Sequence, residues 1–130
     1  MADETGLEGR RILVVEDDMM ISMMLEDMLL ELGCQVLGPA NRLDTALELA
    51  QDAVGVDAAI LDINLGGQPV FPVADALRAR GVPLIFSTGY GDDELRHSDR
   101  GCAILRKPYR AHELAAALRE TLAVPGPKPV

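Results

Sequence analysis

Short apolar runs alternate with longer amphipathic segments along this chain. An apolar run of three to six residues is typical of a strand that is buried on both faces of a sheet. The runs predict strands at 11–15, 34–38, 56–61, 83–88 and 103–105. Because Pro39 follows the second run directly, we expect that strand to end before it.

Between the runs, apolar residues recur every three or four positions, which predicts helices. The predicted helices cover 21–32, 43–50, 70–77 and 110–123. Asn41 is the expected cap of the second helix. The segment 90–100 is polar and has Leu95 as its only large aliphatic residue, so any helix there should be short and loosely held.

Strands that alternate with helices predict a parallel sheet covered by helices on both faces. Right-handed crossovers leave few topologies open. An α/β, flavodoxin-like (βα)5 doubly wound fold, with five parallel strands in the order 2-1-3-4-5, fits a chain of 130 residues best. We expect one domain over residues 11–123, an N-terminal extension over 1–10 and a C-terminal tail over 124–130.

Five of the six methionines lie in the first predicted helix. Met24 and Met28 fall on its apolar stripe and should pack into the core. Met19, Met20 and Met23 fall nearer the outer face. Flexible methionine side chains suit adaptable binding surfaces, so these three either form a docking surface or simply pack against neighbours. Plain packing is the simpler expectation.

The charge of the chain narrows the classes of partner. The formal net charge is -9, which argues against unaided binding to nucleic acid or to anionic lipid. No stretch approaches the ~20 apolar residues of a membrane span, and residues 1–9 lack the apolar segment of a signal peptide. We therefore expect a cytoplasmic protein that is not embedded in a membrane.

The two cysteines show neither metal-site spacing nor a Cys-x-x-Cys pattern. The expected strand order places Cys34 and Cys102 on or beside opposite edge strands. Four strand spacings of ~4.8 Å separate those edges by ~19 Å, far beyond the ~7 Å Cα limit for a disulfide. Both thiols should be free.

Polar and charged residues follow four of the predicted strands at their carboxyl ends. These residues are Glu16 and Asp17, then Asp62, Thr88 and Lys107. The carboxyl ends of parallel strands share one rim, where open α/β sheets bind ligands. Three carboxylates close together repel one another unless a cation compensates, and hard oxygen ligands suit Mg²⁺. With a lysine and a hydroxyl added, the set suits a dianionic group formed on a nucleophilic aspartate.

These motifs resemble the receiver domain of two-component response regulators, over residues 11 to about 123. The matching stretches are Val14-Val15-Glu16-Asp17-Asp18, Leu61-Asp62-Ile63-Asn64-Leu65, Ser87-Thr88-Gly89 and Lys107-Pro108. They occur in the order of the family and at the corresponding strand ends. The resemblance implies a phosphorylation-dependent signalling protein rather than an enzyme, although it would assist its own phosphorylation and dephosphorylation. The implied partners are a sensor histidine kinase or a histidine phosphotransfer protein, and a downstream protein target.

The resemblance also assigns roles to single residues. Asp62 would be the phosphoacceptor. Glu16 and Asp17, together with Asp62 and the backbone carbonyl of Asn64, would hold Mg²⁺. Thr88 and Lys107 would bind phosphoryl oxygens, and the Lys107–Pro108 peptide bond would be cis. Whether the protein dimerises is left open.

Two departures from the family pattern affect the switch. Many members place an aromatic residue three positions before the lysine, where this chain has Ile104. The stretch Pro83-Leu84-Ile85-Phe86-Ser87-Thr88-Gly89-Tyr90 resembles the signature of the "FAT GUY" subgroup, whose members are often stand-alone receivers. Tyr90 is then either an exposed loop aromatic or, with Thr88, part of the switch. We expect the segment 89–98 to respond to phosphorylation.

Two other functions compete with this interpretation. Haloacid-dehalogenase-like phosphatases also use an aspartate at a strand end with Mg²⁺, but Asp62-Ile63-Asn64 lacks the second aspartate of their signature. A protein-interaction module that keeps the receiver fold without being phosphorylated is the main alternative. The presence of all the expected site residues disfavours it.

Overall fold

The structure is a computed structural model, and it describes residues 6–89, 95–96, 99 and 101–123. Tyr90 and most of the polar segment 90–100 lie outside the described residues, so the switch role predicted for Tyr90 stays a prediction.

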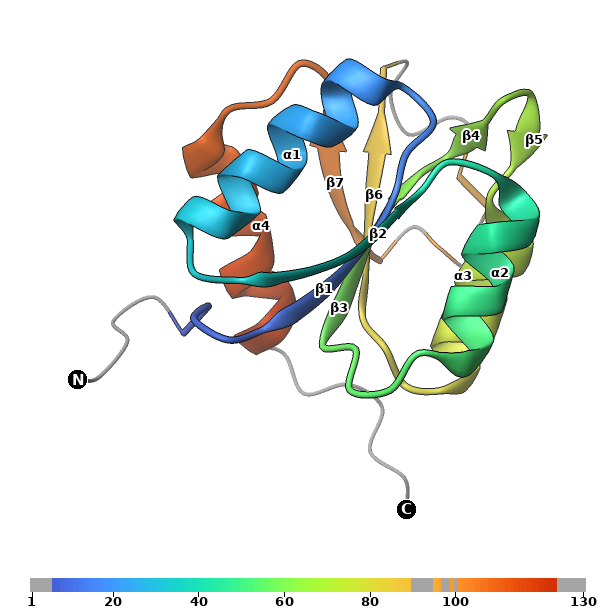
Figure 1. The fold of residues 1–130 in the computed structure, drawn as a ribbon, viewed down its shortest axis with the longest axis horizontal. Coiled ribbons are helices and arrows are strands. Elements are labelled where there is room, and N and C mark those ends of the chain that lie inside the picture. Colours follow the sequence, from blue (N-terminus) through green and yellow to red (C-terminus); the bar gives the residue numbers. More distant parts are fainter. Residues whose placement is uncertain (1–5, 90–94, 97–98, 100, 124–130) are drawn as a thin grey trace.

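Five parallel strands form the central sheet (Figure 1). They are β1 (Arg11–Val15), β2 (Gln35–Ala40), β3 (Ala58–Asp62), β6 (Leu84–Thr88) and β7 (Ala103–Arg106). Their order across the sheet is β2-β1-β3-β6-β7. When these five strands are numbered along the chain, that order is 2-1-3-4-5, so the predicted flavodoxin-like topology is confirmed.

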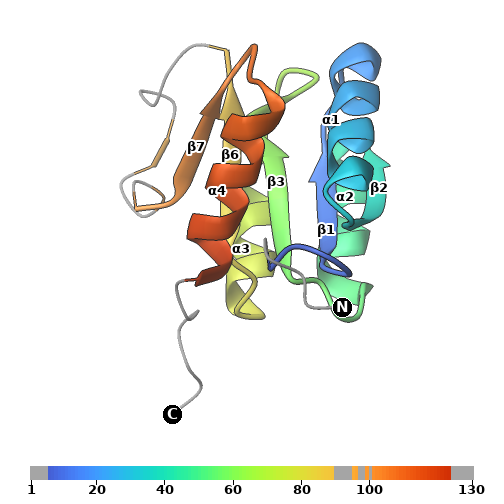
Figure 2. The ribbon, with the colours of Figure 1, turned by 90° about the vertical axis from the view of Figure 1, so that its left-hand side faces the viewer.

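Helices cover both faces of the sheet (Figures 1 and 2). α1 (Met19–Glu31) and α4 (Ala111–Ala123) lie on one face, and α2 (Leu43–Asp52) and α3 (Phe71–Ala79) lie on the other. Each face has its own apolar core, because alternate residues of every strand point to opposite sides. Leu7 belongs to the α1/α4 core, with 1 % of its surface exposed. No helix among the described residues has both the length and the apolar character needed to cross a membrane.

Strand β2 runs past the expected stop at Pro39 and ends at Ala40. β2 is an edge strand, and an edge tolerates proline because the missing N–H need not face a neighbour. The register with β1 shifts at this point, between Leu13↔Leu37 and Val15↔Ala40.

Two helix predictions are wrong in detail. Met24 is 51 % exposed rather than part of the core, because only Ser22, Leu25 and Leu29 of α1 are fully covered. Asn41 does not cap α2: the cap position is Arg42, which makes no side-chain cap bond.

A short hairpin follows β3 where only a loop was expected. It consists of β4 (Asn64–Leu65) and β5 (Gln68–Pro69), joined by Gly66 and Gly67. Both glycines have positive φ, +59° and +88°, as a two-residue hairpin turn of type I′ requires.

The described part of the segment after β6 is tied to α3 more firmly than the sequence suggested. Leu95 is buried in the α2/α3 core. Asp99 is fully buried and pairs with Arg78 at 2.7 Å and with Arg96 at 2.8 Å. Arg96 also pairs with Asp75 at 2.7 Å. Asp99 is thus a second anchor that the hydrophobic pattern did not predict.

Candidate functional site

Three carboxylates meet at the carboxyl ends of β1 and β3. Oxygen atoms of Glu16, Asp17 and Asp62 all lie within 4.8 Å of one another. The register pairs Val15 with Leu61, so the residues that follow them reach the same level of the rim. Glu16 is 2 % exposed and Asp62 8 %, whereas Asp17 is open to solvent. The predicted acidic residues therefore do come together.

Lys107 supplies the positive charge of this cluster. Its Nζ lies 2.9 Å from Glu16 Oε1 and 3.3 Å from Asp62 Oδ2. Burial alone would lower the pKa of Lys107, but its hydrogen bond with Glu16 and the charge of Asp62 outweigh this, and the pKa is raised. The peptide bond between Lys107 and Pro108 is cis, as the resemblance implied.

Asp62 has the most perturbed carboxyl group of the cluster. Burial is the main cause, the neighbouring Glu16 adds to it, and the charge of Lys107 opposes both. Together they raise the pKa of Asp62 to about 7. A divalent cation at this position would favour the charged form and so lower the pKa again.

Asp17 connects the acidic cluster to the hairpin. The Gly66 N–H donates a hydrogen bond to Asp17 Oδ2 at 2.8 Å, and the Gly67 N–H donates to Asn64 Oδ1 at 2.9 Å. Burial pushes the pKa of Asp17 up, but hydrogen bonds from Asp62 and Gly66 outweigh it and hold that pKa below its usual value. The unpredicted hairpin thus fixes one wall of the site.

Asp18 has a structural task beside the cluster. Its carboxylate caps α1 by accepting a hydrogen bond from the Ile21 N–H at 3.1 Å. The Asp18 N–H donates to Glu16 Oε2, also at 3.1 Å. The start of α1 is therefore fixed relative to Glu16.

A cleft of about 490 Å³ opens over these residues. Its lining is Asp17, Asp62, Asn64, Gly66, Gly67, Thr88, Gly89 and Lys107. Every predicted site residue that the structure describes lines the cleft, except Glu16, which lies below it against Lys107. The carboxylates are hard oxygen donors on one side of an open cleft, so they fit Mg²⁺, which takes such ligands and keeps several waters.

Two buried hydroxyl groups on the α1/α4 side of the sheet were not predicted as functional. Ser87 is 1 % exposed and Tyr109 8 %. Burial raises the pKa of Tyr109 to about 12, the charge of Glu16 adds to this, and the nearby Ser87 side chain opposes it. The Tyr109 hydroxyl therefore lies near both Ser87 and Glu16. Tyr109 follows Pro108 in a loop, where no periodic pattern could indicate burial.

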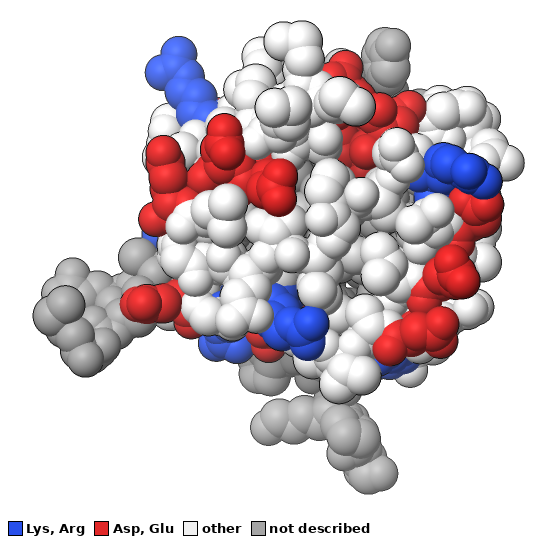
Figure 3. Space-filling model, in the orientation of Figure 1, with Lys and Arg blue, Asp and Glu red and all other residues white. Residues whose placement is uncertain are grey.

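Most of the surface on the face shown in Figure 3 is uncharged, and red Asp and Glu residues cover more of it than blue Lys and Arg residues do. Exposed carboxylates lie on α1 and on α2, for example Asp27 and Glu31 of α1 and Asp44 of α2. The exposed methionines Met19 and Met20 add an apolar area at the start of α1.

Comparison with protein families gives a match over most of the chain. The sequence model of the response regulator receiver domain matches residues 12–119. The phyllosphere-induced regulator PhyR of Methylorubrum extorquens is 28 % identical over 130 residues, which cover 94 % of this chain and 49 % of PhyR. The chain spans about half the length of the curated relatives it matches.

Comparison with solved structures gives the same fold. SdrG from Sphingomonas melonis Fr1 is 41 % identical, with a TM-score of 0.79, 95 % of this chain covered and 100 % of SdrG. The BeF3-activated conformation of SdrG from Pseudomonas melonis Fr1 is 42 % identical, with a TM-score of 0.73 and coverage of 86 % and 95 %. The receiver domain of sensor histidine kinase PA1611 from Pseudomonas aeruginosa PAO1, which has a magnesium ion in its active-site cleft, is 27 % identical. Its TM-score is 0.73, with coverage of 89 % and 99 %.

Proposed function

The chain belongs to the response regulator receiver domain family, and we propose that it accepts a phosphoryl group on Asp62 from a sensor histidine kinase or a histidine phosphotransfer protein. The observation that carries this proposal is the placement of Asp62. Asp62 is the last residue of the buried strand β3. Its carboxylate lines an open cleft and contacts Lys107 at 3.3 Å. Among the three clustered carboxylates, Asp62 alone both lines the cleft and contacts the lysine.

In the proposed transfer, a carboxylate oxygen of Asp62 attacks the phosphorus atom of a phosphohistidine. The new O–P bond forms as the P–N bond breaks, and the imidazole nitrogen of the donor keeps the electron pair. Lys107, which already lies between Glu16 and Asp62, turns to a phosphoryl oxygen. The Thr88 hydroxyl donates to another oxygen from the end of β6. Both residues line the same cleft as the acceptor.

Glu16, Asp17, Asp62 and the backbone carbonyl of Asn64 would hold Mg²⁺ in this site. When bound, the ion would offset the negative charge that builds up between the carboxylates and the phosphoryl oxygens. The magnesium ion in the PA1611 receiver domain and the BeF3-activated state of SdrG support the same use of the corresponding cleft here.

The signal would leave the site through the end of β6. Thr88 is buried at the strand end, and Gly89 follows it in the cleft lining. A hydroxyl that binds the phosphoryl group in one state and not in the other supplies the differential affinity that a switch needs. We propose that the segment 89–98 responds to it and presents the phosphorylated state to a downstream protein. No observation favours the alternative, a receiver fold that acts without phosphorylation.

Uptake of phosphate from a small-molecule donor tests the proposed function. Incubated with acetyl phosphate and Mg²⁺, the protein should gain one phosphoryl group by intact mass, and it should gain none when EDTA removes the metal. Equal uptake with EDTA would refute the metal assignment. No uptake with Mg²⁺, from acetyl phosphate or from phosphorylated histidine donors, would refute the proposed function.

A further inference from the structure

Two buried hydroxyl groups near the acidic cluster lack hydrogen-bond partners. Ser87 Oγ and Tyr109 Oη are the buried side-chain atoms that remain unpaired among the described residues. An unpaired buried hydroxyl costs stability, so each one in a native fold needs an explanation. Here the two lie in the same part of the molecule, which suggests one explanation for both.

The sheet register places Ser87 beside the phosphoacceptor. Ser87 pairs with Asp62 on one side and with Leu105 on the other. Ser87 lies two residues after Ile85, and Glu16 lies two residues after Val14; both of these apolar residues belong to the α1/α4 core. Because side chains two apart in a strand share a face, Ser87 and Glu16 point toward the α1/α4 side of the sheet.

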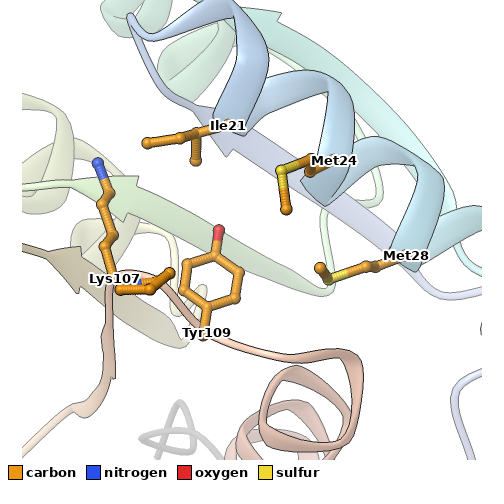
Figure 4. A pocket seen from close by; sticks show the side chains of 6 residues that line it. Ile21, Met24, Met28, Lys107 and Tyr109 are labelled. Carbon is orange, nitrogen blue, oxygen red and sulfur yellow. The ribbon is translucent and has the colours of Figure 1, made fainter.

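Tyr109 approaches the same groups from the α1/α4 side. It belongs to the α1/α4 core, and it lines a cavity of about 290 Å³ between α1 and the loop that connects β7 to α4. Figure 4 shows its hydroxyl directed toward Ile21, with Lys107 on one side and Met24 on the other. The charge of Glu16 acts on this hydroxyl more strongly than that of Asp62.

Glu16 depends on Lys107 in the unphosphorylated protein. Their contact of 2.9 Å is the shorter of the two that Lys107 makes, and Glu16 is almost fully buried. If Lys107 turns to a phosphoryl oxygen, as the proposed function requires, Glu16 loses its main donor in a place that water hardly reaches. The Asp18 N–H donates to Glu16 Oε2, so it is Oε1 that loses its donor. Removing a charged donor from a buried carboxylate oxygen is costly, so another donor should replace the lysine there.

We propose that the Tyr109 hydroxyl is this donor. It is unpaired before phosphorylation and donates a hydrogen bond to Glu16 when Lys107 turns away from Glu16. The Ser87 hydroxyl, the other unpaired group, lies beside it. Tyr109 is then a positioning residue, which stabilises Glu16 in the phosphorylated state and does not touch the phosphoryl group. Since the hydroxyl is unsatisfied in one state and satisfied in the other, it favours the phosphorylated state. This proposal rests on the proposed function.

The test compares Tyr109→Phe with the wild type, because phenylalanine keeps the ring and removes only the hydroxyl. Beryllofluoride, in the presence of Mg²⁺, serves as the phosphoryl mimic, and its binding is followed by ¹⁹F NMR. A hydrogen bond to a charged acceptor corresponds to a change of about tenfold or more in affinity. We therefore expect Tyr109→Phe to bind beryllofluoride about tenfold more weakly. Its melting temperature without ligand should be equal to or above that of the wild type, because an unsatisfied hydroxyl has been removed.

Two further variants separate positioning from plain packing. Ser87→Ala should weaken beryllofluoride binding less than Tyr109→Phe does. The double variant should lose less binding free energy than the two single variants lose in sum. Thr121→Val, which removes a hydroxyl near the other end of α4, is the matched control and should change neither quantity.

Unchanged beryllofluoride binding in Tyr109→Phe would overturn the proposal. A second result would also overturn it: a lower melting temperature of Tyr109→Phe without ligand, together with equal losses of affinity for Mg²⁺ alone and for beryllofluoride. That pattern would describe a purely structural role. A wild-type protein that binds no beryllofluoride would instead refute the proposed function itself, and the proposal would fall with it.

Discussion

Replacing Asp62, the proposed phosphoacceptor, by asparagine should stabilise the metal-free protein at high pH. In the folded protein the pKa of Asp62 is raised to about 7, mainly by burial, whereas its ordinary value is 3.8. Between these pH values the folded state holds a proton that the unfolded state has lost. The free energy of unfolding of the wild type therefore falls as the pH rises from about 4 to about 7. Asp62→Asn carries no titrating group at this position and escapes that loss.

The size of the effect follows from the change in pKa. At 1.36 kcal/mol per pK unit, a pKa that rises from 3.8 to about 7 corresponds to about 4 kcal/mol. The substitution also loses the Asp62 contact with Lys107 at 3.3 Å, which offsets part of this gain. We expect Asp62→Asn to be more stable than the wild type by about 2 kcal/mol at pH 8, or roughly 8 °C in melting temperature for a domain of this size.

The assay is urea and thermal unfolding at pH 5 and pH 8 in EDTA. The gain at pH 8 should be largely lost at pH 5, where Asp62 of the folded wild type is protonated. Excess Mg²⁺ should narrow the difference at pH 8, since it binds the ionised wild-type site better. Asp27→Asn, at an exposed position of α1, is the matched control and should show no such gain. A difference between Asp62→Asn and the wild type that does not change from pH 5 to pH 8 would refute the electrostatic reasoning.

Three further predictions concern the rest of the molecule. Asp99→Asn should lower the free energy of unfolding by about 2 kcal/mol in urea titrations, because it leaves two arginines without their buried charged partner. The exposed Asp75→Asn should lower it by less than about 1 kcal/mol, and equal decreases would contradict this view of the network. Neither cysteine forms a disulfide in the structure, so a thiol reagent should modify the partly exposed Cys102 readily and the buried Cys34 only on unfolding; a disulfide between them would rule out the strand order. Hydrogen exchange over residues 89–98 should change when beryllofluoride and Mg²⁺ bind, and unchanged protection there alongside clear changes elsewhere would rule out the proposed signal route.

The strand ends could be predicted from the sequence because two simple rules act together. Short apolar runs mark buried parallel strands, and the carboxyl ends of parallel strands share one rim of the sheet. These rules were enough to bring Glu16, Asp62, Thr88 and Lys107 to one place. The rules say nothing about the hairpin that fixes Asp17, because its two strands have only two residues each.

Features that depend on the packing of whole elements were beyond the sequence pattern. Met24 lies on the apolar stripe of α1, but it borders the cavity between α1 and the loop that connects β7 to α4, and it remains half exposed. Tyr109 is buried because a loop brings it under the acidic cluster, and no periodicity extends through that loop. Asn41 was a reasonable cap by residue type, yet α2 begins one residue too late for it. Local rules identify elements, and tertiary packing decides which of their side chains are covered.

The most direct test of the central claim is to identify the phosphorylated residue. Wild-type protein and Asp62→Asn are incubated with acetyl phosphate and Mg²⁺, and intact mass and peptide mapping follow the label, while circular dichroism checks that both are folded. The wild type should carry one phosphoryl group on Asp62, and the folded Asp62→Asn variant should carry none. A folded Asp62→Asn variant that is labelled as fully as the wild type would contradict the account.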